Sequence, residues 1–248
     1  MRYLTWMLTL CALILTGCDA SDAERGSKED VSLSVAFHAA DFSAGKSQGQ
    51  PIVGSNGTLE IERFAFVVSE MELRADGDRC LIGALDDDCQ EVEMNPRLVT
   101  LEMDGSATVL TTARVPAGSY TAIEFEIEDV DFDDEEAVEV ATSIRERFAD
   151  WPDGASMLVI GTFTAEDGTV SAFRTYLDAD VEVEREFVEP AEVRHDQTLR
   201  IRVDPSTWFR GENDTVINLA ELAHDLRGEL AELEAEIEEG FASIDWGH

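Results

Sequence analysis

The chain has 248 residues, and its 54 Asp plus Glu against 18 Lys plus Arg give a formal net charge of −36. Because 44% of the residues are hydrophobic, the chain can build a core, so its acidity is not that of a disordered protein, and its length fits one globular domain with extensions. The basic residues are scattered singly along the sequence. This argues against both nucleic acid and an anionic lipid surface as partners, because either would need a basic stripe.

The N-terminus has the features of a bacterial export signal. Arg2 precedes an apolar run at residues 4–15 that is too short to span a bilayer as a helix. The run ends in Leu15-Thr16-Gly17-Cys18, which resembles the lipobox of bacterial lipoproteins, where the cysteine is lipidated and becomes the mature N-terminus. We predict a signal peptide at 1–17, lipid on Cys18 and a flexible tether at 18–30. The alternative is an ordinary secretory signal in which Cys18 has no role.

The cysteine content agrees with a predicted location in the bacterial cell envelope, where lipid anchors the protein to a membrane and the domain lies outside the cytoplasm. Cys11 leaves with the signal and Cys18 carries lipid, so Cys80 and Cys89 remain. Their flanks contain no His and no second cysteine pair. A disulfide in an oxidising compartment is therefore favoured over a zinc site, and closing so short a loop adds roughly 2.5 to 3 kcal/mol in the chain-entropy model.

The middle of the chain has the period-two alternation of half-buried strands, separated by turn signals such as Asp104-Gly105 and Pro116-Ala117-Gly118. Between residues 59 and 73 the alternation changes phase, which predicts a bulge or bend within one long strand. About eight or nine short strands with such turns predict a mainly β fold, an antiparallel β-sandwich, at residues 31–212. The clearest apolar runs are Val31/Leu33/Val35/Phe37, Leu59/Ile61, Phe64/Phe66/Val68, Met71/Leu73, Ile123/Phe125/Ile127, Val181/Val183 and Leu199/Ile201/Val203.

One helix is predicted inside the sandwich. Ala137, Ala141, Ile144 and Phe148 fall at i, i+4, i+7 and i+11, which is the spacing of one helical face. We therefore expect an amphipathic helix over residues 134–150, inserted between two strands.

A second helix is predicted at the C-terminal region, 213–248. Asn218 followed three residues later by Glu221 resembles a capping box. From Leu219 to Ile244 the apolar residues follow an eleven-residue repeat, which favours one long amphipathic helix that runs to about residue 239 or beyond.

The acidic run at residues 129–136 raises the question of a calcium site, because Asp129, Asp131 and Asp133 fall at i, i+2 and i+4. The run does not fit an EF-hand loop, since Asp134 stands where Gly is required and Val140 where a bidentate Glu is required. We favour an acidic helix N-terminus with no metal and no cofactor. A weak calcium site at Asp129, Asp131 and Asp133 is the alternative.

No catalytic pattern is recognisable. None of the histidines has a partner at ligand spacing, and the sequence contains neither a Gly-x-Ser-x-Gly elbow nor a phosphate-binding glycine loop. The larger aromatics fit a carbohydrate platform or core packing, and we favour core packing. The residues concerned are His38, His195, His224 and His248, and Trp151, Trp208, Phe209 and Trp246.

Several segments together resemble a known family. GTLEIERFAFVVSEMEL, the Asp-rich cysteine loop, LVTLEMDG, VPAGSYTAIEFEIEDV and LRIRVDPSTWFRG, with the lipobox, are similar to uncharacterised bacterial lipoproteins of the DUF4382-like, β-sandwich type. The resemblance covers most of residues 31–212. It implies a fold and a location in the cell envelope, and it implies no catalytic residues.

We therefore predict a non-enzymatic lipoprotein whose β-sandwich is a binding or structural module at the envelope. Its partners are the membrane, through the N-terminal lipid, and an unknown protein or carbohydrate ligand. The first alternative is a protein that self-associates through the C-terminal helix. A carbohydrate-active enzyme is the weaker one.

Overall fold

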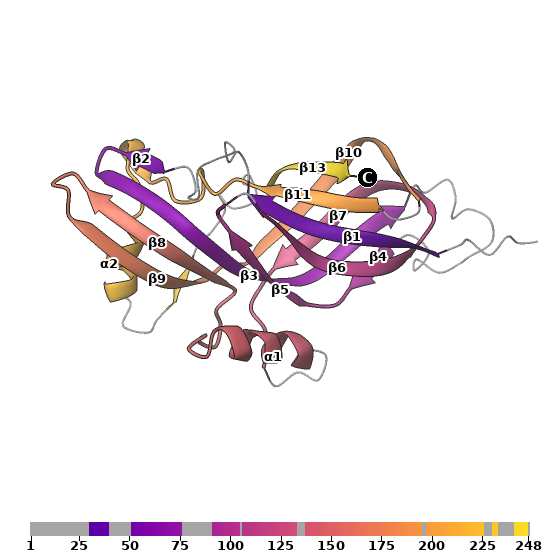
Figure 1. The fold of residues 1–248 in the computed structure, drawn as a ribbon, viewed down its shortest axis with the longest axis horizontal. Coiled ribbons are helices and arrows are strands. Elements are labelled where there is room, and N and C mark those ends of the chain that lie inside the picture. The colour runs from indigo at the N-terminus through magenta and orange to yellow at the C-terminus, as the bar shows by residue number, and fades with distance from the viewer. Residues whose placement is uncertain are drawn as a thin grey trace, which may run out of the picture.

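A computed structural model gives the fold (Figure 1). The structure describes the following parts of the chain: 30–39, 51–75, 91–104, 106–132, 137–194, 197–225, 230–232 and 241–247. The predicted signal peptide, Cys18, and the predicted pair Cys80 and Cys89 lie outside the described residues.

The strands form two sheets. The four-stranded sheet has the order β13 (Phe241–Gly247), β11 (Gln197–Val203), β1 (Asp30–Ala39) and β6 (Ala107–Pro116). The nine-stranded sheet has the order β10 (Val181–Val193), β7 (Gly118–Ile127), β3 (Gly57–Ala75), β8 (Met157–Ala165), β9 (Val170–Asp178) and β12 (Ala231–Glu232), and β2 (Ile52–Gly54), β4 (Glu91–Met94) and β5 (Arg97–Glu102) also pair with β3.

The two sheets pack face to face on one apolar core, which confirms the predicted mainly β sandwich. Phe37 of β1 makes edge-to-face contacts with Phe66 of β3 and Phe125 of β7, at 5.4 and 5.7 Å between ring centroids. Phe241 of β13 lies 5.0 Å from Phe125. Most strand pairs are antiparallel, as predicted, but β1 pairs with β11, and β9 with β12, in parallel.

Strand β3 is one continuous strand with irregular pairing, as the phase changes predicted. The sequence alternation shifts after Ile61 and again after Val68. The register with β8 slips between Ile61 and Arg63, and the register with β7 slips between Val68 and Glu70. Each slip inserts a residue and returns the apolar side chains to the core.

Both edges of β3 are covered by interrupted strands. On one edge, β7 pairs with Val68–Ala75 of β3 and β8 pairs with Gly57–Phe66. Between the end of β7 and the start of β8, the chain leaves the sheet and forms the helical insertion. On the other edge, β4 and β5 are separated by Asn95-Pro96. Strand β3 is thus the element that holds two halves of the larger sheet together.

Helix α1 (Val138–Arg147) confirms the predicted insertion and lies below the sheets in Figure 1. Its buried residues Val140 and Ile144 pack with Ala65 and Val67 on the outer face of β3, in a second apolar cluster. Residues 64–68 of β3 are therefore buried on both faces, which explains why this stretch is continuously apolar.

The predicted long C-terminal helix is wrong. α2 (Leu219–Asp225) has seven residues, and the later described segments are the strands β12 and β13. In β13, Ile244 lies opposite Ile201 and Trp246 opposite Leu199, so these residues also fit a period of two. As a strand, this segment pairs with the edge of β11 and buries Phe241 in the core. These long-range contacts outweigh the helical spacing of its apolar residues. The surface through which self-association was expected is therefore absent from the described segments.

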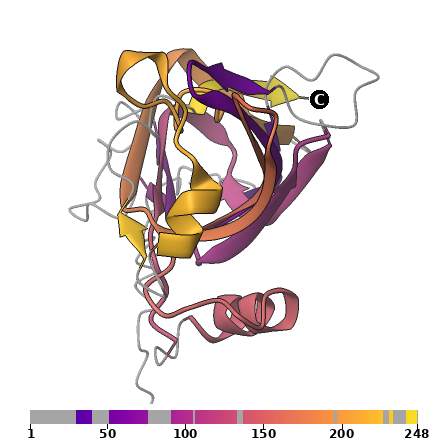
Figure 2. The same cartoon turned by 90° about the vertical axis from the view of Figure 1, so that its left-hand side faces the viewer.

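At the start of α2, Asn218 caps the helix as predicted, and Glu221 contacts the Asn218 side chain rather than its backbone N–H. The Asn218 side-chain oxygen accepts hydrogen bonds from the backbone N–H groups of Ala220 and Glu221, and its amide donates to the Glu221 carboxylate at 3.4 Å. Leu219 is fully buried, and the helix packs on β9 at the end of the sandwich that faces the viewer in Figure 2.

Candidate functional site

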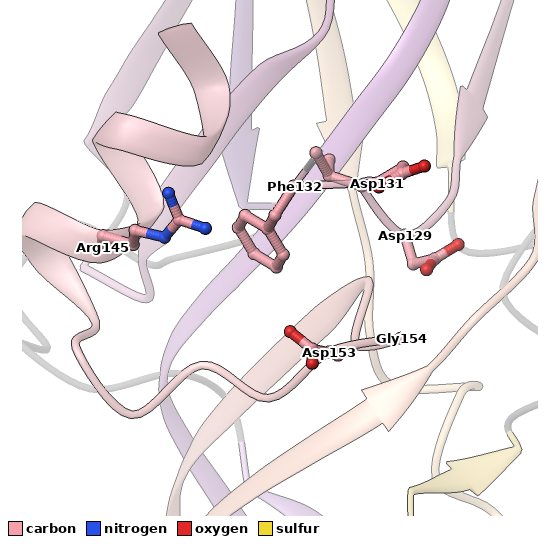
Figure 3. Close-up of a pocket in the computed structure, with 7 residues that line it drawn as sticks. Asp129, Asp131, Phe132, Arg145, Asp153 and Gly154 are labelled. Atoms are coloured by element: carbon pink, nitrogen blue, oxygen red, sulfur yellow. The ribbon is translucent and has the colours of Figure 1, made fainter. Parts of the chain in front are cut away.

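A hollow lies where the helical insertion joins the sheet (Figure 3). The chain leaves β7 at Ile127, passes through residues 129–132, and returns to β8 through residues 148–156. Val130 is buried in the second apolar cluster and fixes this connection. The hollow has a volume of 630 Å³ and is lined by Asp129, Val130, Asp131, Phe132, Arg145, Asp153 and Gly154.

The charged groups of the hollow are mixed in sign. The guanidinium carbon of Arg145 lies 4.8 Å from the centroid of the Phe132 ring, a cation–π geometry. In the view of Figure 3, Arg145 lies to the left of that ring and Asp153 below it. Within the described parts of the chain, no group of three or more His, Cys, Asp or Glu side chains is placed to hold a metal ion. Asp129 and Asp131 reach the hollow, whereas Asp133 lies outside the described residues.

Arg174 of β9 ties the end of α1 to the sheet. It donates two hydrogen bonds to the Asp150 carboxylate, at 3.1 and 2.9 Å, and one to the Tyr176 hydroxyl at 2.8 Å, and it lies over the Phe148 ring at 5.5 Å. Burial raises the pKa of Tyr176 to about 12. The hydrogen bonds from Arg174 lower the pKa of Asp150. Since Arg174 is held by Asp150 and Tyr176 and joins the end of α1 to β9, we assign this cluster a structural role.

A second candidate is the outer side of the larger sheet, where carboxylates stand directly opposite one another on three adjacent strands. The register of β3, β7 and β10 places them in rows. We call the following residues the acidic face: Glu70, Glu126 and Glu182 in one row, Glu72, Glu124 and Glu184 in the next, and Glu128 with Asp180 at the strand ends. Arg74 donates hydrogen bonds to Glu184 at 2.7 Å and Glu124 at 3.1 Å.

Crowding on the acidic face favours the protonated carboxyl. Burial raises the pKa of Glu124, as does a hydrogen bond with Glu182, while Arg74 acts in the opposite direction. Burial and the charges of Glu70 and Glu128 raise the pKa of Glu126. Burial and Asp180 do the same for Glu128. Like charges directly opposite in a sheet destabilise it, so this face opposes folding at neutral pH.

We therefore expect the free energy of unfolding to rise as the pH falls from about 7 toward about 5. Folding raises the pKa of Glu124, Glu126 and Glu128 above the ordinary 4.5, so the native state holds more protons than the unfolded state in the window above 4.5. Their stabilising contribution is present below that value and is lost as the pH rises through the folded pKa. Urea denaturation midpoints across this range measure the effect.

Glu126→Gln tests the assignment to this face. It removes the central charge of the first row, so we expect a gain of about 0.5 to 1 kcal/mol at neutral pH and a shallower pH dependence. Glu166→Gln, at an exposed position in the turn between β8 and β9, is the matched control and should change neither. A stability that increases from pH 5 to 7 in the parent protein contradicts the interpretation.

The structure does not bring the aromatic and histidine candidates from the sequence together in one site within the residues it describes. Trp151, Trp208 and Phe209 are buried, which confirms core packing for them. His38 lies on β1 and His224 on α2. His195 and His248 are outside the described residues, and so is the side chain of Trp246.

Sequence reasoning pointed to Asp129 and Asp131 of the hollow, but it missed the rest of the hollow and the acidic face. No pattern in the sequence indicated Arg145 or Asp153 as residues of a site. The alternating acids of β7 and β10 were visible, but their alignment into rows depends on strand register, which the sequence does not specify. No helix in the described parts is long and apolar enough to cross a membrane.

No family model and no curated protein matches this chain. Among solved structures, MbnP from Methylosinus trichosporium is similar, with 13% sequence identity and a TM-score of 0.38. The match covers 88% of this chain and 98% of that one. The likeness to DUF4382-like lipoproteins stays a prediction.

Proposed function

We propose that this protein is a lipoprotein held at an envelope membrane by lipid on Cys18, and that its β-sandwich is a non-catalytic binding or structural module. The observation that carries the proposal is the order of features along the chain. The lipobox-like Leu15-Thr16-Gly17-Cys18 is followed by a polar segment, and β1 begins at Asp30. A folded β domain thus starts a short distance after the predicted anchor.

The use of polar groups inside the sandwich supports a structural or binding module. The Ser156 hydroxyl donates to the Leu177 carbonyl at 3.4 Å and accepts from the backbone N–H of Ala179 at 2.6 Å. The buried Thr175 hydroxyl donates to the Leu219 carbonyl at 2.9 Å and fixes α2 on β9. These buried hydroxyls connect elements of the fold, while the carboxylates gather on outer surfaces.

Cys18→Ser tests the proposal. We expect the wild-type protein in the membrane fraction after a high-salt wash and the Cys18→Ser protein in the soluble fraction, because an acyl anchor contributes about 0.8 kcal/mol per buried methylene and the variant has none. Cell fractionation with immunoblotting measures the distribution.

Cys11→Ser is the matched control. This cysteine lies upstream of the predicted cleavage point, so its loss should leave the protein in the membrane fraction. If the Cys18→Ser protein fractionates with membranes as the wild type does, the anchor is elsewhere and the proposal is wrong.

A further inference from the structure

The hollow beside α1 combines an apolar floor with a charged rim. Val130 is buried in the second apolar cluster, and Phe132 is partly buried against the same cluster. Three segments supply the charged groups, which are the connection after β7, the second half of α1 and the turn before β8. An apolar floor with a few converging polar groups is the usual form of a small-ligand site, and the volume of 630 Å³ lies within the range of such sites, roughly 300 to 1,000 Å³.

Arg145 is the basic group of the hollow, and its guanidinium has no acidic partner. Its guanidinium carbon lies 4.8 Å from the centroid of the Phe132 ring. Arg174 also lies over an aromatic ring, but it donates two hydrogen bonds to Asp150 as well. Within the parts of the chain that the structure describes, Arg145 makes no hydrogen bond and no ion pair, although three aspartates line the same hollow. The N–H donors of this exposed guanidinium are therefore available to a ligand.

Two carboxylates of the hollow are in the same condition. Among the described residues, neither Asp129 nor Asp153 takes part in a hydrogen bond or an ion pair. In the view of Figure 3, Arg145 lies to the left of the Phe132 ring, Asp129 to its right and Asp153 below it. The hollow thus keeps a positive group apart from negative groups, with an aromatic ring between them.

The charges of the hollow favour one kind of ligand. Arg145 contributes +1 and the three aspartates contribute −3, so the hollow has a formal charge of −2. The aspartates repel a simple anion, and a simple cation leaves the donors of Arg145 unused. A carboxylate with two amino groups has a net charge of +1 and offers a partner to both kinds of group. A planar guanidinium is also well suited to bind a carboxylate through two parallel hydrogen bonds.

We propose that the hollow is a binding site for a dibasic amino acid, a small ligand with one carboxylate, an aliphatic stem and two amino groups. The carboxylate accepts hydrogen bonds from the Arg145 guanidinium, and the amino groups donate to Asp129 and Asp153. The stem packs on the floor that Val130 and Phe132 form. The inference rests on the proposed binding role of the domain and names its ligand, and it is independent of the lipid anchor.

Isothermal titration calorimetry of the full chain in detergent tests the site with three probes of similar stem. Lysine has the carboxylate and both amino groups, cadaverine lacks the carboxylate, and norleucine lacks the terminal amino group. We expect lysine to bind about tenfold more tightly than either of the others, because each of them loses one charge-assisted contact.

Three variants assign the contacts. Arg145→Gln should weaken the binding of lysine about tenfold and should not weaken that of cadaverine. Asp153→Asn should weaken the binding of both. Arg147→Gln is the matched control, because it removes the same charge from an exposed position two residues further along α1 and should change neither affinity.

Two results overturn the inference. If lysine gives no saturable binding, the hollow is not a site for this class of ligand. If cadaverine and lysine bind the parent protein equally, or if calcium displaces both, the hollow is a site for cations only. Neither result changes where the Cys18→Ser protein fractionates, so a failure here is distinct from a failure of the proposed anchor.

Discussion

Replacing Phe37 with Ala is expected to lower the free energy of unfolding by about 3 to 5 kcal/mol. Phe37 is fully buried and touches rings from both sheets, at 5.4 Å to Phe66, 5.7 Å to Phe125 and 6.3 Å to Phe241. Truncation removes the buried ring and leaves a cavity between rigid strands that cannot close around it. The edge-to-face contacts add a further loss of about 0.5 to 1.5 kcal/mol each at most.

Urea denaturation of the parent and the Phe37→Ala protein measures this loss from the midpoint and slope. Val53→Ala is the matched control, because Val53 is 59% exposed on β2 and its truncation should change stability by less than about 0.5 kcal/mol. A loss at Phe37 no larger than the loss at Val53 would mean that the two sheets do not share this core.

A comparable loss, about 3 kcal/mol, is expected for Gly161→Ala. Gly161 lies on β8 opposite Ile61, beside the first register slip of β3. A methyl group there would overlap the carbonyl oxygen of Glu60 and approach the Phe173 ring to 2.9 Å. Because the obstacle is main chain of the central strand, it cannot move without disturbing the pairing on both sides.

Gly168→Ala separates steric overlap from backbone strain. Gly168 has a φ of 84° in the turn between β8 and β9, and nothing lies within 4 Å of the position that a methyl group would take. Its replacement should cost roughly 1 to 2 kcal/mol, the left-handed penalty alone. Thermal unfolding of both variants gives the order, and a Gly168→Ala protein less stable than Gly161→Ala would show that the close approach of β3 and β8 is wrong.

Short-range sequence patterns predicted the features that depend on residues close together in the chain. The phase changes at Ile61 and Val68 located the slips in β3, and the spacing from Ala137 to Phe148 located α1. The helix cap at Asn218 was also predicted, because it depends on residues within one turn.

Long-range pairing could not be predicted in the same way. The apolar residues Phe241 and Ile244 fit a helix as well as a strand, and only the open edge of β11 decides between them. The rows of the acidic face likewise depend on which strands are neighbours. Spacing along the chain contains no information about that choice.

The parallel pairing of β1 with β11 has a consequence for the order in which the domain folds. Leu33 pairs with Gln197, so the smaller sheet joins segments from distant parts of the chain, and loop closure between them is slow. Synthesis of residues 30–194 alone leaves β1 with β6 as its only partner in that sheet. The smaller sheet therefore stays incomplete until β11 has been synthesised, and this delay would suit the export that the lipoprotein proposal requires.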